Sequence, residues 1–179
     1  MVLDCGTFLG FGAIHMARAA AQGRVYAVEA NRACHALLCR NVEANGARNV
    51  EPIHREVWNV KTELALETTV AQGNSLVSEV QKGNAREPVQ TLVIDKFVAE
   101  RGLERLDMLS LTLNGAEVEA LEGATETLHR LRPRIRAAGW YTRGDRRIAD
   151  IIRSTIESAG YDVFVGARGN VMALPKERV

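Results

Sequence analysis

The sequence predicts an α/β fold: a mostly parallel, seven-stranded sheet with helices on both faces and a C-terminal antiparallel hairpin. Short apolar runs alternate with stretches of helical periodicity from residue 2 to residue 159. Two strand-like runs, 162–166 and 170–174, then flank a tight turn at 167–169. An alternation of strands and helices favours parallel strands joined by right-handed crossovers, whereas the closing turn favours an antiparallel pair.

Length and composition predict one domain, residues 1–179, in the cytoplasm. The chain is 46% hydrophobic and 25% charged, which is typical of globular proteins. The formal net charge of +1 gives no electrostatic signature of a nucleic-acid partner. No apolar run reaches membrane-spanning length, and no signal peptide is recognised. Three cysteines at positions 5, 34 and 39 form no CxxC pair, so we expect reduced thiols and no metal site.

The first strand and the loop after it predict a ligand site. Residues 2–12 read VLDCGTFLGFG, in which two apolar residues lead to Asp4 and then to three glycines. Gly6 and Gly10 bracket a short turn, where the lack of a Cβ lets a ligand approach the backbone. The alanine-rich helix expected at about 13–21 offers free N–H groups at its start. A nucleoside cofactor fits such a loop.

The glycine spacing favours one class of cofactor. A dinucleotide fingerprint has G-x-G-x-x-G directly after the strand. Here the order is Asp4-x-Gly6-x-x-x-Gly10, with the acid ahead of the glycines. A carboxylate at that place repels a pyrophosphate but accommodates an ammonium group. The spacing therefore favours S-adenosylmethionine, and an ordinary strand-to-helix turn without a ligand is the alternative.

The second strand, within residues 24–30, ends in a candidate cofactor residue. Glu29 follows Gly10 by 19 residues, close to the spacing at which an acid binds ribose hydroxyls. An ionised carboxylate only accepts hydrogen bonds and therefore matches a vicinal diol. The alternative is a solvated glutamate at a strand end. Asn31 is expected to cap a helix over 32–44, which ends at Asn45-Gly46.

The rest of the chain continues the alternation. We expect a third strand at 50–54, an edge strand at 62–70, turns at 73–75 and 83–84, and an extended-to-helical run at 89–98. We then expect a central strand at 107–113, a helix at 116–131 that Gly123 breaks or bends, a strand at 134–141, and a helix from a cap at Asp145 through residue 159.

Several stretches resemble the FkbM-type methyltransferases. VLDCGTFLGFGA is similar to the family's first cofactor motif, VYAVEAN to its second, and residues 91–133 to the segment around its K-x-D-x-E-G-x-E motif. The resemblance implies a Rossmann-like class I methyltransferase fold with S-adenosylmethionine as cofactor. It implies cofactor contacts from the two motifs, at Asp4, Gly6, Thr7, Phe8, Gly10, Glu29, Ala30 and Asn31.

The third motif departs from the family pattern. Ser110, Thr112 and Asn114 stand where the family has lysine, aspartate and glutamate, whereas Gly115 and Glu117 keep the pattern. The catalytic candidates are therefore Asn114 and Glu117. Asn114 accepts a hydrogen bond but takes no proton at neutral pH. Glu117 is the remaining carboxylate, and its alternative role is a first-turn acid that complements a helix dipole.

Further side chains are expected at the carboxyl ends of strands, where ligands bind in open α/β sheets. Trp140 and Tyr141 are candidates for the wall of an acceptor pocket, with core packing as the alternative. His54, at the end of the third strand, is a second candidate base beside Glu117.

Three functions remain open at this point. The first is an O-methyltransferase acting on a small-molecule, sugar or lipid-linked acceptor. The second is a catalytically weak or inactive cofactor-binding relative with a regulatory role, motivated by the altered third motif. The third is a nicotinamide oxidoreductase, which the glycine spacing disfavours.

Overall fold

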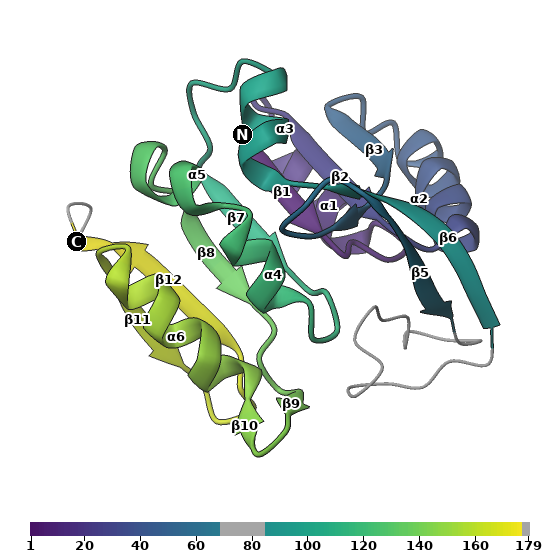
Figure 1. The fold of residues 1–179 in the computed structure, drawn as a ribbon. Helices are drawn as coiled ribbons and strands as arrows, with labels where there is room; N and C mark the ends of the chain where they lie inside the picture. Colours follow the sequence, from purple (N-terminus) through teal and green to yellow (C-terminus); the bar gives the residue numbers. More distant parts are fainter. Residues whose placement is uncertain (69–84, 177–179) are drawn as a thin grey trace.

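The computed structural model describes residues 1–68 and 85–176 of the chain. Its main sheet has seven strands in the order β11-β12-β8-β7-β1-β2-β3 (Figure 1). The strands are β1 (Val2–Cys5), β2 (Val25–Glu29), β3 (Val50–His54), β7 (Met108–Leu111), β8 (Arg134–Ala137), β11 (Tyr161–Val165) and β12 (Val171–Pro175). The first five are parallel, whereas β12 runs antiparallel to both β8 and β11. The predicted fold class is confirmed.

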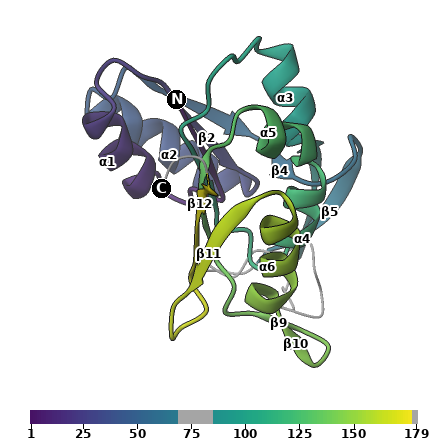
Figure 2. The same ribbon diagram turned by 90° about the vertical axis from the view of Figure 1, so that its left-hand side faces the viewer.

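Helices cover both faces of this sheet. On one side lie α1 (Phe11–Ala19) and α2 (Arg32–Ala44). On the other lie α3 (Ile94–Glu100), α4 (Glu117–Glu122), α5 (Thr125–Arg130) and α6 (Ile148–Ser158). Figure 2 views the sheet nearly edge-on, with these two groups of helices on opposite sides. Within the described ranges, no helix combines the length and apolarity needed to cross a membrane.

Two smaller ladders flank the main sheet. β4 (Glu56–Val57) runs parallel to β6 (Ala85–Leu92), which pairs antiparallel with β5 (Glu63–Thr68). β9 (Thr142–Arg143) and β10 (Arg146–Arg147) form a short hairpin before α6. β5 agrees with the expected edge strand as far as residue 68, and the turns expected at 73–75 and 83–84 lie outside the described residues.

The central strand is buried because both of its faces are covered. In β1, Leu3 and Cys5 face the core beneath α3, α4, α5 and α6, whereas Val2 faces the core beneath α1 and α2. Each of the four residues of β1 is buried. This accounts for the nearly continuous apolar composition of the strand, which is usual for parallel sheets covered on both sides.

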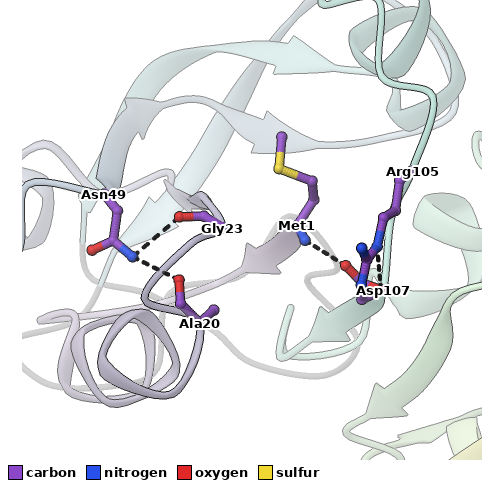
Figure 3. Close-up of polar contacts among 6 residues, drawn as sticks. All are labelled: Met1, Ala20, Gly23, Asn49, Arg105 and Asp107. Carbon is purple, nitrogen blue, oxygen red and sulfur yellow. Dashed lines mark hydrogen bonds and ion pairs between the residues drawn. The ribbon is translucent and has the colours of Figure 1, made fainter.

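Polar contacts fasten the amino ends of the strands (Figure 3). The amino group of Met1 forms an ion pair with Asp107 at 2.5 Å, and Arg105 donates to the same carboxylate at 2.7 Å. The side-chain amide of Asn49 donates to the carbonyl oxygens of Ala20, at 3.0 Å, and Gly23, at 3.2 Å. The first set of contacts joins the entries of β1 and β7, and the second joins those of β2 and β3, at the edge away from the strand carboxyl ends.

Two expectations about local structure are wrong. The strand expected at 134–141 ends at Ala137, because Gly139 turns the chain against α6, where its carbonyl accepts the Ala149 N–H at 3.1 Å. Asp145 does not cap α6, which begins after Arg147 without a side-chain cap. Instead, Asp145 lies in the turn of the β9–β10 hairpin.

Candidate functional site

A cleft of about 390 Å³ opens at the carboxyl edge of the parallel strands. Its wall is built from the segments that follow β1, β2, β3, β7 and β8, which is where ligands bind in open α/β sheets. The lining residues are Gly6, Phe8, Val28, Glu29, Ala30, Arg55, Glu56, Val57, Thr112, Leu113, Asn114, Trp140 and Tyr141.

The glycine loop lies tightly against the sheet. The N–H groups of Gly6 and Thr7 donate to the Val28 carbonyl at 2.9 and 3.1 Å, and Gly10 donates to the Thr7 carbonyl at 3.0 Å. Gly6 has φ +76°, and a Cβ there would lie 1.9 Å from the Thr112 carbonyl oxygen. The loop therefore depends on glycine at position 6 both for its backbone conformation and for its contact with the end of β7.

Glu29 links the glycine loop to the start of α2. One carboxylate oxygen accepts the Phe8 N–H at 2.8 Å, and the other accepts the Asn31 N–H at 2.9 Å. Burial raises its pKa to about 7, although these backbone hydrogen bonds act in the opposite direction. The bond to Phe8 holds a non-glycine residue at φ +55°. Glu29 thus shapes the loop as well as lining the cleft.

Other predicted cofactor residues lie behind the wall of the cleft. Asp4 is buried in β1, and burial raises its pKa, with Ser110 and the charge of Arg136 opposing the shift. Gly10 precedes α1 at φ +85°, and Asn31 caps α2 by accepting the Cys34 N–H at 2.9 Å. Neither these three residues nor Thr7 is among the lining residues, whereas Gly6, Phe8, Glu29 and Ala30 are.

The segment after β7 places Asn114 in the cleft. Asn114 adopts φ +51°, a left-handed conformation that asparagine tolerates better than most residues. Its side-chain oxygen accepts a hydrogen bond from the Tyr141 hydroxyl at 3.2 Å. Trp140 and Tyr141 line the same cleft from the segment beyond β8.

Glu117 supports this segment from behind. Its carboxylate accepts the Leu113 N–H at 2.7 Å and the Gly115 N–H at 2.9 Å, and its side chain is fully buried. Burial raises its pKa to about 7 against these backbone hydrogen bonds. Arg143 adds a second tie, donating to the Gly115 carbonyl at 2.7 Å and to Glu119 at 2.8 Å. Glu117 is not a lining residue, so its position is that of a scaffold for Asn114.

Glu56 is a cleft residue that the sequence motifs do not predict. This residue lies in β4, two positions after β3, and is buried while lining the cleft. One of its oxygens accepts the N–H of Val57 at 2.8 Å. The rule that identified Glu29, an acid at the carboxyl end of a parallel strand, also applies here. His54, the second candidate base, does not line the cleft, and its ring nitrogen lies 2.9 Å from the Ala30 carbonyl oxygen.

Because of three buried carboxyl groups in or behind the wall of the cleft, we expect the stability of the protein to depend on pH. Burial raises the pKa from 4.5 to about 7 for Glu29 and Glu117 and to about 8 for Glu56. A carboxyl with a raised pKa stabilises the fold below its unfolded pKa, and this contribution is lost as the pH rises through its folded pKa. We expect the free energy of unfolding of the ligand-free protein to fall by on the order of a few kcal/mol between about pH 5 and about pH 8.5. Urea denaturation across this range measures the change.

Two variants identify the groups responsible. Glu56→Gln removes the group with the highest of these three pKa values, so its stability should fall less steeply with pH. Glu104→Gln makes the same change of charge at an exposed position and should keep the wild-type slope. A wild-type stability that rises with pH over this interval would contradict the assignment.

Comparisons with known proteins agree with this architecture. A family model described as the methyltransferase FkbM domain matches residues 4–163. The methyltransferase sdnD of Sordaria araneosa is 23% identical over 193 residues, which cover 90% of this chain and 73% of that protein.

Solved structures show the same fold. The methyltransferase FkbM of Methylobacillus flagellatus KT superposes with a TM-score of 0.66 at 14% identity, over 97% of this chain and 42% of its own. The O-methyltransferase of Bacillus cereus, solved in complex with SAH, superposes with a TM-score of 0.55 at 19% identity. The match covers 98% of this chain and 73% of that protein. The present chain thus spans less than half of the FkbM structure. Since the family model matches 4–163 of its 179 residues, the chain belongs to the methyltransferase FkbM domain family.

Proposed function

We propose that residues 1–179 form one S-adenosylmethionine-dependent methyltransferase domain that methylates a hydroxyl group of a small-molecule or glycan acceptor. The observation that carries this proposal is the pairing of the Gly6 loop with Glu29 in one cleft. Family membership supports the reaction class, and the Bacillus cereus O-methyltransferase supports oxygen as the acceptor atom.

The charges in the cleft suit this cofactor. Two buried carboxyl groups, Glu29 and Glu56, line the cleft together with one arginine, Arg55. When these carboxyl groups are ionised, such a wall disfavours the pyrophosphate of a dinucleotide and accommodates a cationic ligand. S-adenosylmethionine supplies a methyl group on a positively charged sulfur. Gly6, Phe8, Glu29 and Ala30 would hold its nucleoside portion.

The acceptor hydroxyl is best placed beside Asn114 and Tyr141. Both line the cleft, and the hydrogen bond between them fixes the Asn114 amide. Asn114 orients a hydroxyl by accepting its hydrogen bond but does not remove its proton. Glu117 acts through the backbone of Leu113 and Gly115 and is a positioning residue. Transfer then depends on orientation in the cleft, which by itself supplies a large part of many rate enhancements, and the proton that the hydroxyl releases passes to water.

The first test is ligand-induced stabilisation. A ligand that binds only the folded state adds about 2.7 kcal/mol at 100 times its dissociation constant. For a chain of this size we expect S-adenosylmethionine or S-adenosylhomocysteine to raise the melting temperature by roughly 5–10 °C. NAD serves as the control because it carries a pyrophosphate. Stabilisation by NAD alone would refute the cofactor assignment.

The second test restores an acid at position 114. General-base assistance typically contributes about 10²–10⁴-fold, so we expect Asn114→Glu to increase methyl transfer to a hydroxyl acceptor by tenfold or more. Transfer of a labelled methyl group to a panel of alcohols, sugars and phenols, at equal folded fractions, measures the change. Asn114→Gln, whose side chain is as long as that of glutamate but carries no charge, should give no increase. A fast wild-type rate that falls in Asn114→Glu would show that asparagine is the adapted residue.

A second candidate function is cofactor binding without turnover. The observation that favours it is the substitution of Thr112 and Asn114 for the two family acids, because both positions line the cleft. This candidate predicts ordinary affinity for S-adenosylmethionine and no labelled product with any acceptor of the panel. If Asn114→Glu restores methyl transfer, the wild-type protein lacks a general base. If it does not, the panel lacks the right acceptor or the protein only binds the cofactor.

A further inference from the structure

Glu56 has the features of a ligand-binding carboxylate. It comes from β4, outside the three motifs that resemble the family pattern. Its side chain is 6% exposed, and it nevertheless lines the cleft. Its Oε1 accepts the Val57 N–H at 2.8 Å, which fixes the direction of the carboxylate. Among the described residues, its Oε2 accepts no hydrogen bond and forms no ion pair.

The groups around Glu56 leave its negative charge without compensation. Glu29 approaches from β2 and Glu117 from the start of α4, and the negative charges of both disfavour ionisation of Glu56. Cys5 of β1 lies on the same side, as a buried and neutral thiol. The neighbouring Arg55 is exposed, and its guanidinium donates to the His54 carbonyl at 2.8 Å.

A buried carboxylate is costly unless a cation or several hydrogen-bond donors accompany it. The described protein groups provide a single backbone N–H, so a cationic ligand in the cleft can supply a second partner when Glu56 is ionised. We propose that Glu56 is a specificity-determining residue whose free oxygen faces the positive sulfonium of S-adenosylmethionine and distinguishes this donor from its neutral thioether product. This inference rests on the proposed function, because it assumes that cofactor.

The charge difference between donor and product gives the inference its mechanism. S-adenosylmethionine and S-adenosylhomocysteine share the adenosine, the ammonium and the carboxylate, and differ in the methyl group and the sulfonium charge. Ionised Glu56 stabilises the sulfonium and has little effect on the thioether. Loss of the charge on methyl transfer would therefore weaken the hold on the product and favour its release.

The pH dependence of the affinity ratio tests this without any acceptor. Burial raises the pKa of Glu56 to about 8, so the group becomes ionised as the pH rises from about 6 to about 9. We expect the affinity for S-adenosylmethionine, divided by that for S-adenosylhomocysteine, to increase at least tenfold over this interval. Isothermal titration calorimetry of the wild-type protein measures both affinities. Contributions from Glu29 to ribose binding cancel in the ratio, because both ligands carry the ribose.

A variant assigns the effect to Glu56. In Glu56→Gln most of the pH dependence of the ratio should disappear, and at pH 9 the ratio should be at least tenfold lower than in the wild type, with the affinity for the thioether nearly unchanged. Glu104→Gln, exposed and outside the cleft, should behave as the wild type does. Equal losses for both ligands in Glu56→Gln would overturn the inference and assign Glu56 to cleft structure alone.

The titration of the wild-type protein tests the role of Glu56 even if Glu56→Gln fails to fold. A ratio that stays constant from pH 6 to pH 9 would overturn the role of Glu56 while leaving the proposed function intact, since both ligands still bind. Absence of binding by either ligand at every pH would overturn the proposed function together with this inference.

Discussion

Gly6→Ala is expected to abolish cofactor binding and to lower the free energy of unfolding by about 4 kcal/mol. The new Cβ would lie 1.9 Å from the Thr112 carbonyl oxygen and 2.8 Å from its carbonyl carbon. Both are backbone atoms, so no side-chain rotation relieves the overlap. The end of β1 must then separate from the end of β7, which breaks the hydrogen bond from the Thr112 N–H to the Cys5 carbonyl.

Gly46→Ala is the matched control for this substitution. Gly46 ends α2 at φ +59°, and no atom lies within 4 Å of a Cβ built there. Alanine at position 46 therefore suffers the left-handed backbone strain alone, about 1–2 kcal/mol, and should bind the cofactor normally. Denaturant unfolding and calorimetry on both variants separate strain from overlap. Equal destabilisation of the two variants would refute the close approach at Gly6.

Glu29→Ala is expected to weaken binding of S-adenosylmethionine by at least about thirtyfold, which corresponds to roughly 2 kcal/mol. The variant loses the carboxylate that we propose binds the ribose, and it also frees the N–H groups of Phe8 and Asn31, which Glu29 holds at 2.8 and 2.9 Å. Phe8 then has no partner that fixes its left-handed conformation. Water that enters the cleft can solvate both donors, so the protein should remain folded.

Two further variants sharpen this result. Glu29→Gln keeps one acceptor oxygen and should bind with intermediate affinity, because one of the two backbone donors stays paired. Glu104→Ala removes an exposed carboxylate outside the cleft and should leave binding unchanged. Calorimetry that finds wild-type affinity in Glu29→Ala would place Glu29 among structural residues only.

Helix bounds that depend on local sequence signals were predicted well. The bounds of α2 follow from the Asn31 cap at one end and Asn45-Gly46 at the other, and both signals act within a few residues. Gly123 does separate α4 from α5, as expected from its position in the helical stretch. These features depend on sequence neighbours, so a single sequence contains them.

Features set by tertiary contacts were predicted less well. Asp145 has the chemistry of a helix cap, but the β9–β10 hairpin occupies its position, and Arg143 ties that hairpin to Glu119. Glu117 was placed near the right segment, yet its burial behind Asn114 depends on how α4 packs. Glu56 was missed because its burial follows from the pairing of β4 with β6, whose contributing residues are more than thirty positions apart. The family, the fold and the position of Glu29 were accessible from short motifs, whereas the role of Glu56 and the burial of Glu117 were not.

The position of β1 in the middle of the sheet affects how the chain can fold during synthesis. Val2 pairs with Val25 on one side and with Met108 on the other, so the second neighbour of β1 is translated long after the first. At about 5–20 residues per second, the interval is on the order of 5–20 s. For that time an apolar strand has one edge without a hydrogen-bonding partner, which is a known route to aggregation. A nascent chain that stalls before β7 is synthesised should therefore depend on chaperones. Once β7 has left the ribosome, it can pair with β1 and complete the centre of the sheet.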